Sequence, residues 1–281
     1  MTLTKAVVEL YKKASTELPD DVVIAIKKAK NNEKKKSIAS SVLDIILKNI
    51  NIAKNSSKPI CEDSGMPTFY VYYNKNYSTE KLKKIIFNAT AIATKKNYLR
   101  ENAVNSLTNK NTKTGFGNNI PIINFNEWNN KFLKIDLILK GGGSENVSMQ
   151  YSLPNIKLKA NRDLDGIKKC VIDAVKKAQG FGCAPGIIGV GIGGDRATSY
   201  NLAKKQLFRK LNDKNNNKIL EKLENDLYKK LNLLGIGPMG LGGKTTVLAV
   251  KAGTIDRIPA SFFVSISYMC WACRRKSLVI K

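Results

Sequence analysis

The sequence predicts a mixed α/β fold, of the α/β or α+β class, in which helices flank sheets and glycine-rich turns lie at the strand ends. Three observations support this prediction. The first 54 residues have helical periodicity, short β-prone runs alternate with helical segments further along, and glycine-rich strings follow several apolar runs. The chain has 281 residues, of which 43% are hydrophobic and 25% charged, as in ordinary globular proteins.

Residues 1–54 are expected to be helical because their apolar side chains recur at steps of three and four residues. Pro19 and Asp20 suit the start of a helix. After the turn PICEDSG, the run TFYVYY predicts a strand, and residues 79–107 return to helical spacing. The polar loop NKNTKTGFGNNIP then precedes FLKIDLILK, which has the composition of a strand.

The second half of the sequence alternates in the same way. Helices are predicted for IKKCVIDAVKKAQ, ATSYNLAKKQLFRKL and EKLENDLYKKLNLL, and strands for GIIGVGIGG, TTVLAVKAG and SFFVSISYM. We find no internal repeat. We therefore expect residues 1–281 to form one domain, with a helical N-terminal part over about residues 1–54.

The net charge is +26, from 48 Lys and Arg against 22 Asp and Glu. Almost all of the excess is lysine, spread over helix faces and accompanied by asparagine, whereas proteins that bind nucleic acids usually depend on arginine and aromatic residues. Nucleic acid is therefore not expected as a partner, whereas a positive surface attracts a dianionic substrate or an acidic protein. Because the sequence lacks a long apolar run and a signal peptide, we expect no membrane association and a cytoplasmic location.

Five cysteines without a secretory signal indicate reduced thiols, and hence metal binding or catalysis. Cys170 lies on the apolar side of a predicted helix and is expected in the core, whereas Cys61 and Cys183 lie in turns and Cys270 ends a strand. The C-x-x-C formed by Cys270 and Cys273 lacks both histidines for a zinc site and a thioredoxin-like βαβ context. Three cysteines from distant segments could instead bind three irons of a 4Fe-4S cluster.

Two glycine-rich strings raise the possibility of nucleotide binding. GVGIGG satisfies the dinucleotide-binding spacing, but no acidic residue follows at the end of a second strand. LGGKTT resembles the end of a P-loop, but Pro238 stands where that motif requires glycine. Such turns also bring backbone N–H groups close to any anion, including a carboxylate.

Five segments, in this order, carry a resemblance that covers nearly the whole chain: PICEDSG, KGGGSEN with MQYSLP, GCAPGIIGVGIGGDR, LGIGPMGLGGKTT and PASFFVSISYMCWACRR. Together they resemble the N-terminal domain, or α subunit, of class I fumarate hydratases and of the related L-tartrate dehydratases. The resemblance implies that Cys61, Cys183 and Cys270 hold a 4Fe-4S cluster, with one iron left open for the substrate. It implies no such role for Cys273.

The same resemblance implies roles for five further positions. Asp63 would shuttle a proton to and from the departing hydroxyl, and Arg100 would grip a substrate carboxylate. Gly142 and Gly143 would offer backbone N–H groups to the substrate. Glu62 would also contact the substrate, but many relatives have glutamine there.

Two further features depart from the family pattern. Ile258 stands where some relatives have histidine, and the sequence ends at Lys281, before the second domain of single-chain members. We therefore expect the chain to be inactive alone and to require a β-type subunit, in an α2β2 complex or a homodimer of the pair.

The function implied by the resemblance is the reversible hydration of fumarate, a small dicarboxylate, to L-malate, which is a reaction of the tricarboxylic acid cycle. The cluster would make the enzyme sensitive to oxygen. Dehydration of L-tartrate is an alternative that uses the same chemistry. A non-catalytic cluster-binding domain is an alternative of another class, and a basic nucleic-acid-binding module is the weakest of the four hypotheses.

Overall fold

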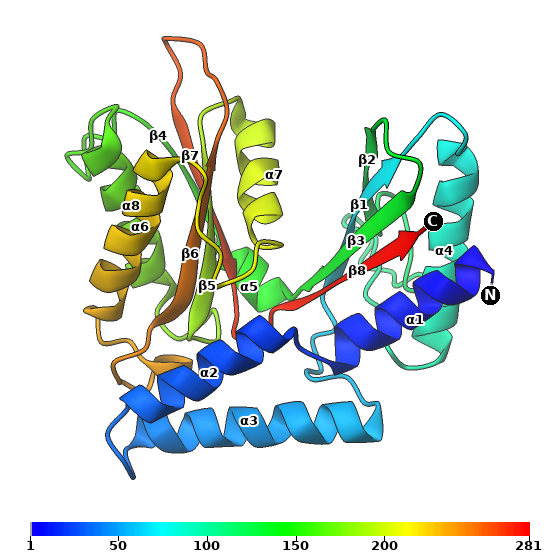
Figure 1. Ribbon diagram of the computed structural model, residues 1–281, viewed down its shortest axis with the longest axis horizontal. Coiled ribbons are helices and arrows are strands. Elements are labelled where there is room, and N and C mark those ends of the chain that lie inside the picture. Colours follow the sequence, from blue (N-terminus) through cyan, green and yellow to red (C-terminus); the bar gives the residue numbers. More distant parts are fainter. Residues whose placement is uncertain (1) are drawn as a thin grey trace. The chain divides into compact units, whose positions relative to one another are not determined.

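The computed structural model describes residues 2–281, which divide into two compact units (Figure 1). Unit 1 consists of the stretch ending at Pro19 together with Lys48–Gly142 and Ala272–Lys281, and unit 2 of Asp20–Leu47 and Gly143–Trp271. The mixed α/β prediction is confirmed, because each unit contains a mixed four-stranded sheet with helices packed on it. Among residues 2–281, no helix has the length and apolar character needed to cross a membrane.

Unit 1 contains a sheet with the strand order β2-β1-β3-β8, in which β1 and β2 are parallel and the other pairs antiparallel. The helices α1 and α4 lie against this sheet, and their apolar side chains form one core with those of β1 and β3. Unit 1 also includes the second part of α3. Its elements are α1 (Leu3–Thr16), α3 (Ile38–Ser56), β1 (Met66–Tyr73), α4 (Thr79–Lys95), β2 (Ile122–Glu127), β3 (Leu133–Lys140) and β8 (Arg274–Ile280).

Unit 2 contains a sheet with the order β4-β7-β5-β6, in which β5 and β6 are parallel. Figure 1 shows α6 and α8 on one side of this sheet and α7 on the other. The elements of unit 2 are α2 (Asp20–Asn32), the first part of α3, α5 (Gly142–Asn146), β4 (Met149–Ser152), α6 (Leu164–Ala178), β5 (Gly186–Ile192), α7 (Arg196–Gln206), α8 (Lys218–Asn232), the 3-10 turn η1 (Pro238–Gly240), β6 (Val247–Thr254) and β7 (Phe263–Met269).

The glycines of the GVGIGG string allow a helix to pack closely on a strand. A Cβ atom on Gly189 would lie 2.1 Å from the Ala203 carbonyl oxygen, and one on Gly191 would lie 2.1 Å from that of Ser199. Both carbonyls belong to α7. The glycines therefore face α7, and the alternate residues Ile188, Val190 and Ile192 fill the core shared with α6 and α8.

The N–H groups of the LGGKTT string bind a carboxylate from the chain itself. Glu33, just after α2 and 8% exposed, accepts hydrogen bonds from the backbone N–H of Lys244 at 2.9 and 3.0 Å and from that of Thr245 at 2.9 Å. The anion-binding geometry inferred from the glycines is thus present. In unit 2 it fastens the end of α2 beside the start of β6.

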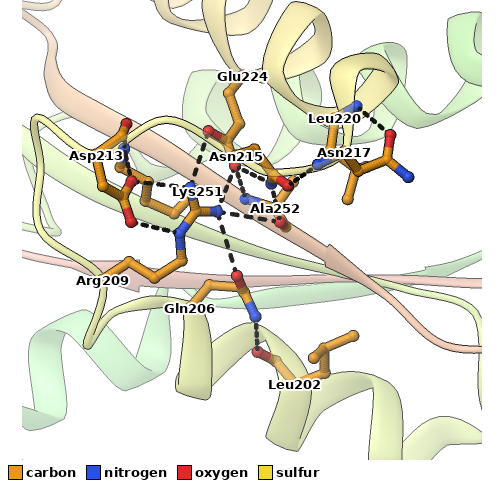
Figure 2. Close-up of polar contacts among 10 residues, drawn as sticks. All are labelled: Leu202, Gln206, Arg209, Asp213, Asn215, Asn217, Leu220, Glu224, Lys251 and Ala252. Atoms are coloured by element: carbon orange, nitrogen blue, oxygen red, sulfur yellow. Dashed lines mark hydrogen bonds and ion pairs between the residues drawn. The ribbon is translucent and has the colours of Figure 1, made fainter.

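An ionic network ties the loop after α7 to β6 and α8 (Figure 2). Asp213 accepts hydrogen bonds from Arg209 at 2.8 and 2.9 Å and from Lys251 at 2.6 Å. Arg209 also donates to Glu224 at 2.6 Å, and Glu224 accepts from the backbone N–H of Ala252 at 2.8 Å. Because the Lys251 side chain is only 4% exposed, this network neutralises a buried cation.

The structure differs from the predicted elements in two ways. The helix predicted for residues 79–107 ends at Lys95, because Asn97 adopts a left-handed conformation with φ +59° that stops the helix. The strands β2, β4 and β8 were not predicted at all. All other helices and strands predicted from the sequence are present, with small shifts at their ends.

Candidate functional site

The CEDSG turn in unit 1 carries three of the predicted site residues, of which Cys61 and Asp63 are half-buried and Glu62 is exposed. The turn is tightly packed because Gly65, with φ +80°, lies against the end of β3. A Cβ atom at this position would lie 2.9 Å from the backbone of Leu139 and Lys140. Glycine is therefore required both for the conformation of the turn and for its contact with β3.

The carboxylate of Asp63 is held by backbone N–H groups from two segments. Oδ1 accepts from Gly65 at 3.0 Å, and Oδ2 accepts from Gly142 at 2.6 Å. The guanidinium of Arg274, a side chain only 1% exposed, donates to the Asp63 backbone carbonyl at 2.6 Å. The carboxylate of Asp63 thus has a fixed position in unit 1, next to Gly142.

Ser64 joins the same turn to the loop that contains Arg100. Its hydroxyl oxygen accepts hydrogen bonds from the backbone N–H of Arg100 at 2.8 Å and from Nδ2 of Asn102 at 3.0 Å. Arg100 lines a polar pocket of about 460 Å³ together with Asn97, Asn102 and Asn111. Unit 1 therefore brings together Asp63, Gly142 and the backbone of Arg100, three positions that are far apart in the sequence.

Cys183 and Cys270 lie close together in unit 2. Cys183 has a left-handed backbone with φ +53°, which is uncommon for a residue with a side chain. Its carbonyl oxygen accepts a hydrogen bond at 3.3 Å from the backbone N–H of Trp271, the residue after Cys270. The backbone N–H of Cys270 in turn donates to the Ser144 hydroxyl of α5 at 3.1 Å.

Tyr268 is a buried side chain near these two cysteines. Its ring packs against Gly182 and Gly186, where Cβ atoms would come within 2.4 and 2.5 Å of ring atoms. Burial, with the charges of Cys270 and Cys183 as further causes, raises the pKa of Tyr268 above its usual value. Its hydroxyl is buried and has no hydrogen-bond partner among residues 2–281.

The remaining two cysteines have a different environment. Cys170 is fully buried among the apolar side chains of α6, as expected, and burial, followed by the charge of Asp173, raises the pKa of its thiol to about 12. Cys273 is also fully buried, with Arg275 Nη1 at 3.6 Å from its sulfur. The three predicted ligands are therefore the partly exposed cysteines, and the two predicted non-ligands are the buried ones.

The donor set suits an iron-sulfur cluster, because such clusters are held mainly by cysteine thiolates and the chain contains no histidine. All five cysteines lie within residues 2–281, and none of them forms a disulfide there. The same residues contain no ready-made group of three or more Cys, Asp or Glu side chains that could hold a metal ion. Cys61 belongs to unit 1, and Cys183 and Cys270 belong to unit 2.

Sequence reasoning missed several residues that hold the site. The predicted substrate contacts Gly142 and Gly143 are both exposed on α5. The roles of Ser64, Arg274 and Tyr268 were not predicted. A polar Ser64 next to the predicted proton shuttle was a possible signal. No local sequence pattern predicts that Arg274 is buried or that the Tyr268 ring packs against two glycines.

Comparisons with known proteins identify the family of the chain. A family model described as fumarate hydratase (Fumerase) matches residues 4–279. The chain is 47% identical over 277 residues to a putative class I fumarate hydratase of Geobacillus stearothermophilus, covering 97% of this chain but 54% of that protein. The chain thus spans about half the length of this relative.

Two further relatives have nearly the same length as this chain. It is 37% identical to a putative L(+)-tartrate dehydratase subunit alpha of Methanocaldococcus jannaschii, covering 100% of this chain and 98% of the relative. It is 30% identical to the L(+)-tartrate dehydratase subunit alpha of Escherichia coli, covering 99% and 90%. The chain therefore belongs to the class I fumarate hydratase family, as its N-terminal or α-subunit part, and is related to the α subunits of L-tartrate dehydratases.

Proposed function

We propose that the chain is the α subunit of a 4Fe-4S-dependent hydro-lyase that hydrates fumarate reversibly to L-malate. The observation that carries the proposal is the fixed carboxylate of Asp63, two residues after a half-buried cysteine and hydrogen-bonded to the glycine segment at Gly142. The 47% identity to a putative class I fumarate hydratase supports fumarate as the substrate.

Cys61, Cys183 and Cys270 are the proposed cluster ligands. When bound through three thiolates, a 4Fe-4S cluster supplies a Lewis-acidic iron without a protein ligand, which makes loss of a hydroxyl group feasible. These three cysteines are partly exposed, whereas Cys170 and Cys273 are buried. A buried thiol whose pKa is raised, as that of Cys170 is, is a poor source of the thiolate that iron requires.

The residues of the chain itself would bind the substrate and move its proton. Asp63 would hold the proton that leaves with the hydroxyl group, since hydrogen bonds at 3.0 and 2.6 Å fix both of its carboxylate oxygens. Arg100 would bind a substrate carboxylate through its guanidinium, which suits bidentate contacts. Glu62, Gly142 and Gly143 are exposed and would complete the substrate contacts, with the Gly142 N–H already donating to Asp63 at 2.6 Å.

A separate β-type subunit would supply the rest of the active site. Two relatives of nearly the same length are described as alpha subunits, and a putative class I fumarate hydratase is about twice as long. We expect the chain alone to be inactive, and the pair to form an α2β2 complex or a homodimer of the pair. The net charge of +26 would favour an acidic partner surface.

L-tartrate is the second candidate substrate. The α subunits that match over 98% and 90% of their lengths belong to proteins described as L(+)-tartrate dehydratases. The test is an anaerobic assay of the chain combined with its β-type partner on fumarate, L-malate and L-tartrate. Hydration of fumarate supports the proposal, activity on tartrate alone would assign the second substrate, and a cluster-containing pair with no activity would indicate a non-catalytic domain.

The ligand assignment is tested by single Cys→Ser variants prepared without oxygen. Replacing Cys61, Cys183 or Cys270 should abolish the cluster absorbance, while Cys170→Ser and Cys273→Ser should retain it. Wild-type activity should also decay in air, because an iron without a protein ligand is open to oxidation and loss. Cluster loss in Cys273→Ser together with retention in Cys270→Ser would refute the assignment.

A further inference from the structure

The Ser64 hydroxyl is buried at the junction of two segments of unit 1. The residue is 1% exposed, and its oxygen accepts two hydrogen bonds, from the Arg100 backbone N–H at 2.8 Å and from Asn102 Nδ2 at 3.0 Å. A third hydrogen bond, from the Asn102 backbone N–H to the Arg100 carbonyl at 2.8 Å, closes the loop on itself. One hydroxyl therefore fastens a compact turn to the residue that follows Asp63.

Arg100 lies in a loop that is also attached at other points. Its side chain is exposed, and within residues 2–281 its guanidinium makes no ion pair, so the group is available to a ligand. Leu99 is 4% exposed and anchors the loop on one side. On the other side, Ala103 is 1% exposed and the Glu101 carbonyl accepts a hydrogen bond from Asn111 Nδ2, while the hydrogen bonds to Ser64 join the loop to the residue that follows Asp63.

We propose that Ser64 is a positioning residue that fixes Arg100 relative to Asp63 and thereby sets the affinity for the substrate carboxylate. The inference rests on the proposed function, in which Arg100 binds the carboxylate and Asp63 moves the proton. It deepens that function by assigning a role to a residue that contacts neither the substrate nor the cluster. The Ser64 hydroxyl thus links the segment of Asp63 to the segment of Arg100.

The structure separates this role from a general effect on folding. Asp63 is held by Gly65, Gly142 and Arg274, and none of these contacts uses the Ser64 side chain. Loss of the hydroxyl should therefore leave the proton-transfer group in position and loosen only Arg100. The expected signature is a raised KM with a retained kcat, whereas a distorted turn would lower kcat as well.

The experiment uses the anaerobically prepared pair of this chain and its β-type partner, with fumarate and L-malate as substrates. Ser64→Ala should raise KM about tenfold, equivalent to roughly 1.4 kcal/mol of lost binding, and leave kcat within about twofold. Ser64→Thr retains a hydroxyl and should restore most of the affinity. Ser15→Ala is the matched control, because Ser15 is a fully buried serine of the same unit with a hydroxyl bonded to the Lys12 carbonyl.

A second measurement does not depend on activity or on the cluster. Hydrogen exchange at the Arg100 backbone amide should be faster in Ser64→Ala than in the wild type, and close to the wild-type rate in Ser64→Thr and Ser15→Ala. If Ser64→Ala fails to fold, Asn102→Ala offers a second test at an exposed residue. It removes the hydrogen bond from Asn102 to the Ser64 hydroxyl and should also accelerate exchange of the Arg100 amide. Unchanged exchange in the variants that fold would overturn the inference.

The outcomes distinguish the inference from the proposed function. An active pair in which Ser64→Ala leaves KM unchanged, or lowers kcat without rescue by Ser64→Thr, overturns the positioning role alone. A wild-type pair that is inactive on every dicarboxylate overturns the proposed function and, with it, the link to substrate affinity.

Discussion

Removal of the Asp213 carboxylate should destabilise unit 2 strongly, because it leaves a buried cation without its ionic partner. In Asp213→Ala, Lys251 loses its bond to Oδ1 at 2.6 Å and keeps only the Asp213 backbone carbonyl at 2.9 Å (Figure 2). Arg209 loses both bonds to this carboxylate but keeps Glu224. The damage is therefore concentrated on Lys251.

The magnitude follows from the exposure of each group. Breaking a fully buried pair costs about 3 to 5 kcal/mol. The Lys251 side chain is 4% exposed, but that of Asp213 is 32% exposed, so solvent reduces the loss. We expect a loss of about 3 kcal/mol in the free energy of unfolding, or roughly 6 to 12 °C in Tm.

The assay is urea unfolding followed by circular dichroism, applied as a double-mutant cycle with Lys251→Met. Lys251→Met removes the buried cation and keeps a side chain of similar length, so Asp213→Ala should cost only about 1 kcal/mol in that background, leaving a coupling of about 2 kcal/mol. As a control, Glu80→Ala breaks an ion pair with Lys84 whose side chains are 75% and 72% exposed, and it should cost less than about 0.5 kcal/mol. Equal costs of Asp213→Ala in both backgrounds would refute the argument.

The pH dependence of the same variant gives an independent check. Burial opposes ionisation of Asp213, but hydrogen bonds from Arg209 and Lys251 outweigh it and lower the pKa of the carboxyl in the folded state. The stabilisation is therefore present above the unfolded pKa of about 3.9 and is lost as the pH falls through the lower folded value. The difference in stability between wild type and Asp213→Ala should narrow below about pH 4.

Two further predictions concern the glycine segments. Gly141→Ala should lower kcat roughly 10- to 100-fold, because its Cβ would lie 2.6 Å from Asp63 Oδ2 and displace the carboxylate; an unchanged kcat in steady-state kinetics of the pair would contradict this. Glu33→Ala should destabilise unit 2 by about 2 kcal/mol, because the N–H groups of Lys244 and Thr245 lose a buried acceptor, and urea unfolding with no change would exclude this role.

Periodicity predicted most of the fold, and the failures have physical causes. The N-terminal helices were predictable because each carries a complete apolar stripe. The strand β8 was missed because it is an edge strand whose first residues are the buried arginines 274 and 275, which resemble a solvated charged segment. The strand β4 has only four residues, too few to show an alternating pattern.

The site was predictable only as far as its motifs extend. Turn chemistry and family resemblance identified Cys61, Asp63 and Gly142, and the structure brings the last two into a hydrogen bond. The links made by Ser64 and Arg274 could not be predicted, because they join residues that are far apart in sequence. Ser64 and Arg100 are 36 residues apart, and Asp63 and Arg274 are 211 residues apart. Contacts of this range depend on the whole sheet of unit 1 and leave no local pattern.

The most direct test of the central claim is the iron and acid-labile sulfide content of anaerobically prepared protein, combined with electron paramagnetic resonance of the oxidised and reduced forms. If Cys61, Cys183 and Cys270 hold the cluster, the wild type should contain about four irons and four sulfides per chain. The variant with all three replaced by serine should contain neither. Wild-type protein without sulfide, or an unchanged spectrum in the triple variant, would contradict the proposal.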